Sequence, residues 1–170
     1  YQAEVSQGTL QAIYEYQSMI CGLTGMEVAN ASLYDGATAL AESILMACAV
    51  RRKNLVLLPS SLPGRIRDVL KSYSVGKNVE LKYLPYTDQG TLDIEALKKG
   101  MSTEVAAVVI AQPNYFGMIE DTFQIAEIVK ESPALMIAYV EPVSLALLSP
   151  PGEYGADIAV GEGQSMGLPQ

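Results

Sequence analysis

Residues 105–117 read Val-Ala-Ala-Val-Val-Ile-Ala-Gln-Pro-Asn-Tyr-Phe-Gly. Seven apolar residues in succession, Val105–Ala111, are typical of a strand that is covered on both faces, as in a parallel sheet. The next six, Gln112–Gly117, are polar and turn-forming, which indicates a loop at the carboxyl end of that strand. Ligands of open parallel sheets bind at such strand ends. The stretch therefore predicts a buried parallel strand followed by a candidate binding loop.

Helical and strand patterns alternate on both sides of this strand. Helices are expected to begin at caps or turns at Ser6, Asp35-Gly36, Pro63, Asp93 and Asp121. Strands are predicted at Leu55–Leu58, Ala134–Val140 and Asp157–Val160, and alternation of apolar and charged residues predicts another at Val79–Leu84. A short segment, Val28–Leu33, is expected to be extended. We therefore expect an α/β fold, a mainly parallel sheet with helices on both faces, formed by residues 1–170 as a single unit.

Composition and charge exclude several classes of protein. Apolar residues make up 49% of the chain and charged residues only 18%, a balance that excludes intrinsic disorder and favours large apolar surfaces. The net charge of −8 argues against a nucleic-acid partner, because phosphate contacts need clustered Lys and Arg. The longest apolar runs are too short to cross a membrane. We expect a cytoplasmic protein that binds neither nucleic acid nor a membrane.

The chain contains no histidine, which removes Ser-His-Asp and Cys-His arrangements and the common imidazole zinc sites. No metal site is expected. Cys21 and Cys48 are interpreted as buried thiols, with a disulfide as the less favoured alternative. Chemistry in this chain must use carboxylates, tyrosines, lysines, backbone amides or a cofactor.

One candidate site is residues 34–39, Tyr-Asp-Gly-Ala-Thr-Ala, where the chain turns into a helix. Free backbone amides and the positive end of the helix dipole favour a phosphate there. The alternative is that Asp35 only caps the helix and Gly36 makes the turn, and motif strength alone favours this alternative. An acid at this turn would repel a phosphate unless its side chain is bonded to the helix's own amides.

Three further segments follow expected strands. The loop Gln112–Gly117 holds a ligand or simply connects two elements, and the two readings are evenly balanced. Glu141 contacts a cofactor nitrogen or faces solvent, which is the commoner case. The glycine-rich run Gly161–Gly167 approaches a ligand, acts as a lid, or is a flexible end, and its glycine spacing is not the dinucleotide-binding fingerprint.

Taken together, these segments resemble one family. The matching stretches are residues 1–11 (YQAEVSQGTLQ), 29–39 (ANASLYDGATA), 112–117 (QPNYFG), 150–157 (PPGEYGAD) and 161–165 (GEGQS). They are spread over nearly the whole chain. They are similar to the glycine-cleavage P-protein, in the first subunit of its two-subunit form or the amino-terminal half of its fused form.

The resemblance implies the large domain of an aspartate-aminotransferase-like (fold type I) pyridoxal-phosphate enzyme. The domain is expected to be incomplete here, since the sequence begins without a methionine and is interpreted as a piece of a longer protein. The family decarboxylates glycine and passes the aminomethyl group to the lipoyl H-protein, with pyridoxal phosphate storing the electrons. A second, lysine-bearing P-protein subunit is the implied partner.

The sequence departs from the family's pattern where the cofactor is held. Ser165 occupies the expected Schiff-base lysine position, serine forms no imine, and no lysine follows Lys130. Where the group has an Asp for the pyridine nitrogen, this chain has Glu141. We therefore expect no catalytic residue here and pyridoxal phosphate bound covalently by the partner. Vestigial cofactor contacts are expected at Asp35, Gly36, Ala37, Thr38 and Asn114.

Three functions remain open. The first is a non-catalytic subunit of glycine decarboxylase, inactive alone, that completes the partner's active site through Tyr1, Gln2 and Glu4. The alternatives are a purely structural scaffold and an independent phosphate-ligand-binding domain. The family also places an antiparallel strand between Val28–Leu33 and Asp157–Val160, so we expect a gap there with exposed edges that favour self-association.

Overall fold

Five strands alternate with helices in the computed structural model, which describes residues 2–167. The elements, in chain order, are α1 (Ala3–Thr24), α2 (Gly36–Arg51), β1 (Leu55–Pro59), α3 (Gly64–Ser74), β2 (Glu80–Leu84), α4 (Ile94–Gly100), β3 (Val105–Gln112), α5 (Thr122–Lys130), β4 (Leu135–Val140), the 3₁₀ turn η1 (Pro142–Ala146), α6 (Pro151–Tyr154), β5 (Ile158–Gly161) and the 3₁₀ turn η2 (Gln164–Met166).

The strands form one sheet in the order β2-β1-β3-β4-β5, and every neighbouring pair is parallel. β3 lies at the centre, and all of its residues are buried, as its apolar run predicts. The five predicted strands that belong to this sheet are confirmed to within one residue at either end. A parallel sheet places the carboxyl ends of all five strands at one edge, where the candidate residues are expected to gather.

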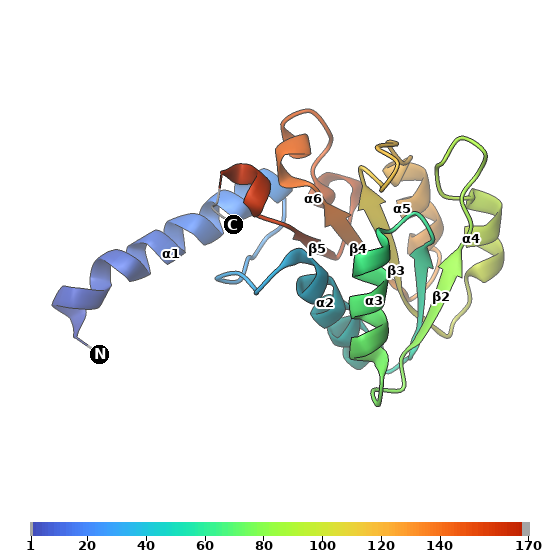
Figure 1. Cartoon of the computed structure of the whole chain (residues 1–170), viewed down its shortest axis with the longest axis horizontal. Coiled ribbons are helices and arrows are strands. Elements are labelled where there is room, and N and C mark those ends of the chain that lie inside the picture. Colours follow the sequence, from blue (N-terminus) through green and yellow to red (C-terminus); the bar gives the residue numbers. More distant parts are fainter. Residues whose placement is uncertain (1, 168–170) are drawn as a thin grey trace.

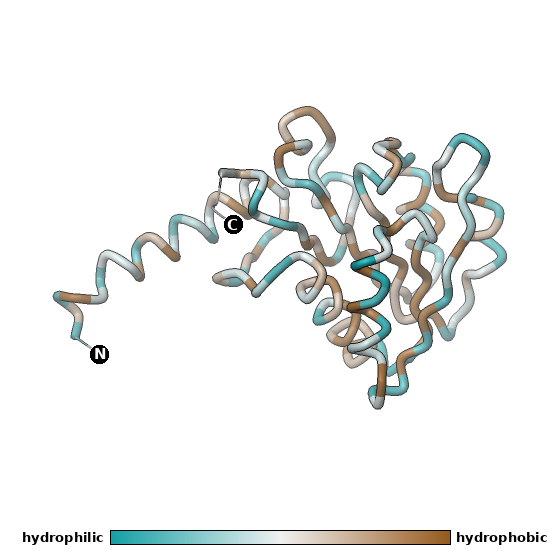
Figure 2. Tube along the Cα trace, in the orientation of Figure 1, coloured by the Kyte–Doolittle hydropathy of each residue, from teal (hydrophilic) through white to brown (hydrophobic). Residues whose placement is uncertain are grey.

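Helices cover both faces of the sheet, α2 and α3 on one and α4, α5 and α6 on the other (Figure 1). Successive strand residues point to opposite faces, so Val56 and Leu58 pack with α2 and α3 while Leu57 packs on the α4 side. Figure 2 shows the hydrophobic colouring concentrated along the strands. The predicted α/β architecture is confirmed.

α1 projects from the sheet as a long arm (Figure 1). Its carboxyl-terminal end packs against the body, where Thr24 is buried and Leu23 contacts the core. Gly25 ends the helix with a φ of 68°, and a Cβ on Gly152 would lie 2.0 Å from the Gly25 carbonyl oxygen, so the two backbones touch. Apolar side chains along the arm are exposed, namely Val5, Leu10, Ile13, Tyr14 and Met19.

The extended segment predicted at Val28–Leu33 is wrong, because these residues form no strand. The side chain of Asn30 accepts a hydrogen bond from the Ser32 amide at 3.1 Å, and Ser32 adopts a φ of 89°. This local turn replaces extended backbone. Within residues 2–167, β5 therefore has no strand on its outer side, and the predicted gap has only one wall.

The predicted start of the first helix at Ser6 is also wrong. The carbonyl of Gln2 accepts hydrogen bonds from the amides of Val5 and Ser6, so the helix begins at Ala3 and Ser6 lies inside it. The acidic first turn is favourable at a helix N-terminus and supports the longer helix.

Cys21 and Cys48 are free thiols, as predicted; Cys48 is buried, and burial raises its pKa, whereas Cys21 is only partly buried, contrary to the prediction. Among the helices of the described residues, none is long and apolar enough to cross a membrane. The same residues contain no group of three or more Cys, Asp or Glu side chains placed to hold a metal ion.

Candidate functional site

The N-terminus of α2 contains the residues predicted to contact phosphate. Asp35 caps this helix: its Oδ1 accepts hydrogen bonds from the Thr38 hydroxyl and the Thr38 amide, each at 2.7 Å. Thr38 Oγ1 in turn accepts from the Asp35 amide at 3.2 Å, which completes a capping box. The hydroxyl and amide of Thr38 lower the pKa of Asp35. The carboxylate is thus bonded to the helix's own groups.

Glu162, directly after β5, lies in front of the same helix. Its Oε2 accepts a hydrogen bond from the Gly36 amide at 2.9 Å. A Cβ on Gly36 would lie 3.3 Å from both Cβ and N of Glu162 and 3.0 Å from the Tyr139 hydroxyl oxygen, so a larger residue would crowd both neighbours. Ala37, next in the helix, is buried in the core. The first amide of α2 therefore binds a carboxylate that the chain itself supplies.

Negative charge dominates this end of α2. Burial raises the pKa of Tyr139 on β4, and the charges of Glu162 and Asp35 raise it further. Arg65, at the start of α3, acts on Tyr139 in the opposite direction. Two carboxylates thus act on the phenol against one guanidinium.

Glu141 and Ser165, the positions that the resemblance relates to a cofactor-binding Asp and Lys, lie beside each other, Glu141 just before η1 and Ser165 in η2. Burial raises the pKa of Glu141, but hydrogen bonds from the Ser165 hydroxyl and from the backbone of Ser144 and Val143 shift it downward overall. Glu141 Oε2 accepts from the Ser144 amide at 2.8 Å and so caps η1. The carboxylate that follows β4 has its partners within the chain.

Asn114 is buried in the loop between β3 and α5, and its side chain organises that loop. Nδ2 donates to the Gly90 carbonyl oxygen at 2.8 Å and to Glu120 Oε1 at 2.7 Å. Oδ1 accepts from the amides of Phe116 at 2.9 Å and Met118 at 3.2 Å. Both donor hydrogens and both acceptor positions of the amide group are thus used inside the chain.

The residues predicted to complete a partner's site lie elsewhere. Tyr1 is outside the described residues. Gln2 is the N-cap of α1 and Glu4 lies in its first turn, and both are exposed. Figure 1 places the start of α1 at the far end of the arm, so the structure does not bring these residues together with Asp35 and Glu162.

The side chains at this edge do not fit a covalently bound pyridoxal phosphate. A phosphate at α2 would meet the carboxylates of Asp35 and Glu162, and the latter already accepts the Gly36 hydrogen bond. Ser165 cannot form an imine. The chain keeps the helix N-terminus that suits an anion, but fills it with its own acids.

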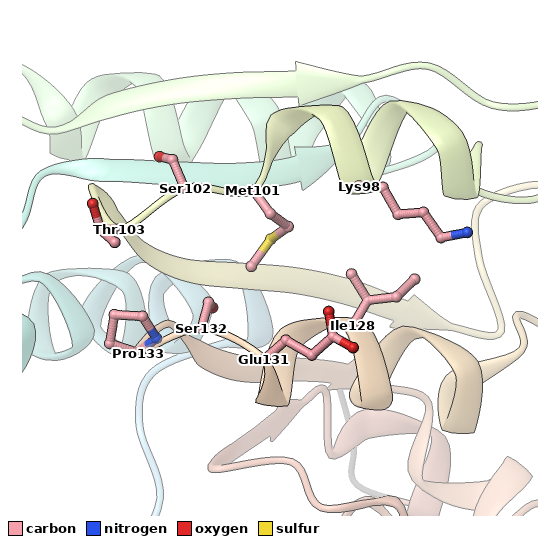
Figure 3. A pocket seen from close by; sticks show the side chains of 8 residues that line it. All are labelled: Lys98, Met101, Ser102, Thr103, Ile128, Glu131, Ser132 and Pro133. Carbon is pink, nitrogen blue, oxygen red and sulfur yellow. The ribbon is translucent and has the colours of Figure 1, made fainter.

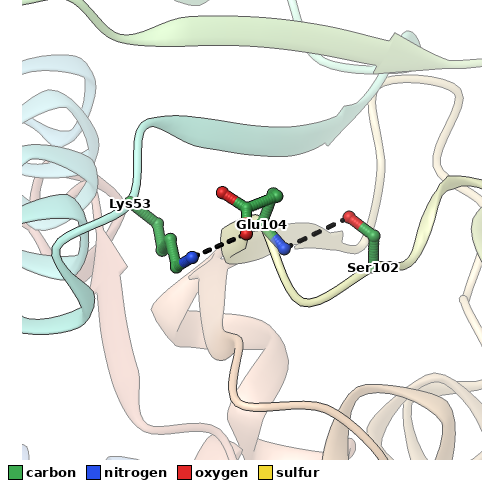
Figure 4. A network of polar contacts seen from close by, with 3 residues as sticks. All are labelled: Lys53, Ser102 and Glu104. Atoms are coloured by element: carbon green, nitrogen blue, oxygen red, sulfur yellow. Dashed lines mark hydrogen bonds and ion pairs between the residues drawn. The ribbon is translucent and has the colours of Figure 1, made fainter.

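A hollow of about 300 Å³ lies at the opposite edge of the sheet, between α4 and α5 (Figure 3). Lys98 lines it and pairs with Glu95 at 3.0 Å. Beside it, the Ser102 hydroxyl accepts from the Glu104 amide at 3.3 Å, and Glu104 pairs with Lys53 at 2.7 Å (Figure 4). These contacts are a local turn and two exposed ion pairs, and such ion pairs add little to the stability of the fold. Their polar groups do not point toward a common position where a ligand could bind.

Sequence reasoning did not single out Glu162 or Tyr139 as neighbours of α2. Glu162 follows a strand directly, which is a usable signal, but the strand order that places β5 beside α2 is not readable from local patterns. Glu120 was also missed, because an exposed and a buried carboxylate look alike in a sequence.

Comparison with known proteins supplies the family. The model of the glycine cleavage system P-protein family matches residues 1–170. The probable glycine dehydrogenase (decarboxylating) subunit 1 of Desulfitobacterium hafniense is 53% identical over 169 residues, which is 99% of this chain and 38% of that relative. The chain thus spans about two fifths of the length of such relatives.

Solved structures agree. The crystal structure of a glycine decarboxylase (P-protein) of the glycine cleavage system in inhibitor-bound form is 46% identical, with a TM-score of 0.92 over 100% of this chain and 38% of that one. A C-DES variant with glycine covalently linked to its PLP cofactor has a TM-score of 0.74 over 96% of this chain, but 11% identity, and shows the fold alone. The predicted fold type I architecture and family resemblance are confirmed, and the chain belongs to the glycine cleavage system P-protein family.

Proposed function

We propose that this chain is part of the non-catalytic subunit of a glycine decarboxylase and that it helps to complete the active site of a lysine-bearing second subunit. The observation that carries the proposal is the internal bonding of the positions that would hold a cofactor. Glu162 Oε2 accepts from the first amide of α2, and Glu141 Oε2 accepts from the Ser144 amide. Pyridoxal phosphate, which stores the electrons released in decarboxylation, belongs in this proposal to the partner alone.

Similarity to proteins named glycine dehydrogenase (decarboxylating) subunit 1 supports a two-subunit enzyme. Glycine is the proposed substrate, and the lipoyl H-protein is the proposed acceptor of the aminomethyl group. This chain, in isolation, is proposed to be inactive.

The arm α1 supports a role at an interface. Its exposed apolar side chains are costly to leave in water, and Gln2 and Glu4 stand at its tip. An arm of this length reaches beyond the body that carries it, which a residue completing a neighbour's site must do. We propose that Tyr1, Gln2 and Glu4 act in the partner's active site.

A purely structural scaffold is the second candidate. A scaffold would also have its cofactor positions bonded within the chain. Only the exposed arm α1 therefore favours a subunit that completes the partner's site over a scaffold. The third candidate, an independent phosphate-binding domain, is disfavoured by the two carboxylates at α2.

The test replaces Tyr1, Gln2 and Glu4 by Ala in the complete two-subunit complex. If these residues act in the partner's site, we expect kcat to fall about a hundredfold with assembly unchanged, because misplaced substrate groups cost that much. Glycine decarboxylation and light scattering provide the two readouts.

The matched control replaces Gln11 and Glu15 by Ala, a pair on the same helix that is joined by a hydrogen bond of 2.8 Å and exposed. The control complex should turn over as wild type. Unchanged kcat in both variants would favour the scaffold.

A further inference from the structure

A hydrogen bond at the start of α2 joins two parts of the chain that are distant in the sequence. Glu162 follows β5, and its Oε2 accepts from the amide of Gly36, the first residue of a 16-residue helix. Asp35 accepts from the amide two residues further along. Two of the amides that a helix leaves without partners in its first turn, those of Gly36 and Thr38, are thus bonded to acids of this chain.

We infer that Glu162 is a built-in substitute for a bound anion: its carboxylate takes the place at the start of α2 that a phosphate would need, and thereby fastens the segment after β5 to this helix. The inference concerns the chain's own structure and holds whichever role the subunit has in a complex.

The charge of Glu162 suits this position. The amide groups and the dipole at a helix N-terminus favour a negative group, and a hydrogen bond from a backbone amide to a carboxylate is stronger than one to a neutral acceptor. Asp35 covers the Thr38 amide and leaves the Gly36 amide to a second anion. An external phosphate would therefore have to displace Glu162 and then lie beside Asp35.

The backbone around Glu162 is fitted closely on two sides. A Cβ on Gly161 would lie 2.4 Å from the Val140 carbonyl oxygen, so the end of β5 is pressed onto β4. A Cβ on Gly36 would crowd Glu162 and the Tyr139 hydroxyl at 3.0–3.3 Å. Two glycines at the contact points allow this approach, which holds the Glu162 backbone against α2 and β4.

The experiment measures hydrogen exchange of the peptide around Gly36–Thr38 in the complete subunit, with and without millimolar inorganic phosphate. In wild type, phosphate should change nothing. In Glu162→Ala, exchange of this peptide should accelerate about tenfold, because a charged hydrogen bond is lost. Phosphate should then restore protection, because the position is free.

Two further variants make the result specific. Glu127→Ala removes an exposed carboxylate of α5 and should match wild type in both conditions. Glu162→Gln keeps the oxygen acceptor and the side-chain volume, so it preserves the fold; we expect an intermediate rate and no response to phosphate.

Three results would overturn the inference. They are protection of the wild-type peptide by phosphate, wild-type exchange in Glu162→Ala or Glu162→Gln, and failure of phosphate to restore protection in Glu162→Ala.

Discussion

At the start of α2, carboxylate side chains decide whether the free backbone amides bind an external ligand or groups of the chain itself. Backbone amides at a helix N-terminus bind phosphates in many proteins. Here Asp35 bonds the Thr38 amide and Glu162 bonds the Gly36 amide. The same amides therefore stabilise the chain's own fold, and the carboxylates repel an incoming anion.

The cap at Asp35 should contribute measurably to stability. We predict that Asp35→Ala lowers the free energy of unfolding by about 1 kcal/mol at pH 7, since the Thr38 amide loses its acceptor. The pKa of Asp35 is lowered in the folded chain from its ordinary value of 3.8. The contribution is therefore fully present above pH 3.8 and is lost as pH falls through the lower folded pKa. Denaturant unfolding of both proteins between pH 7 and pH 2 measures it.

The exposed carboxylate of Asp88 provides the control, because no hydrogen bond to it occurs among the described residues. Asp88→Ala should stay within about 0.5 kcal/mol of wild type. A difference for Asp35→Ala that grows as the solution becomes more acidic would contradict the assignment of the cap.

Among the elements, α1 is exposed along most of its length and packs against the rest of the chain only at its carboxyl-terminal end. There Thr24 is buried and Gly25 touches the backbone of Gly152. Only glycine at position 152 permits that contact, because a Cβ there would overlap the Gly25 carbonyl oxygen. The direction of the arm is consequently fixed where it meets α6.

Two glycine substitutions are predicted to have opposite effects, because Gly152 touches Gly25 whereas Gly8 has open space around it. Gly152→Ala should destabilise the chain by about 2 kcal/mol and loosen the arm, because its Cβ would lie 2.0 Å from the Gly25 carbonyl oxygen. Gly8→Ala, with no atom within 4 Å of the added Cβ, should stabilise the arm by about 0.5–1 kcal/mol. Urea unfolding and proteolysis at residues 25–30 measure both changes. Equal proteolysis of the two variants would contradict the proposed anchor.

Elements with strong local signals were predictable from the sequence. The apolar run of β3 and the caps Asp93 and Asp121 each appear where the pattern placed them. Val28–Leu33 was not predictable in this way, because a short segment between two helices carries no local signal of whether a neighbouring strand exists to bond it. The Asn30 side chain decides that segment.

For the whole molecule, the two edges of the sheet differ. β2 carries the exposed charges Glu80 and Lys82, which discourage pairing with another chain. β5 has four half-exposed residues, Ile158–Gly161, without any charge. The edge at β5 is therefore the one open to a further strand.

We predict that the 170-residue chain, isolated from any partner, self-associates through β5 and the exposed apolar side chains of α1. Ala159→Lys should weaken the association, because it places a charge on the open edge. Light scattering measures the mass, and the control is Asp88→Ala, an exposed position that follows β2 at the other edge of the sheet. A monodisperse monomer for the unaltered chain would contradict the prediction.

The candidate site was predictable only in part. The motif around Asp35 and Gly36 was evident from the sequence, but the acid that occupies it comes from 126 positions away. Such a pairing depends on strand order, which places β5 beside β4 and over α2. Local patterns carry no information on that order.

The most direct test of the account is reductive trapping in the complete complex. Pyridoxal phosphate is added to this subunit alone and together with its lysine-bearing partner, imine absorbance is recorded, and borohydride reduction is followed by mass mapping. We predict a reduced, mass-shifted lysine in the partner only. A yellow imine and a trapped lysine in this chain alone would contradict the claim that it holds no cofactor.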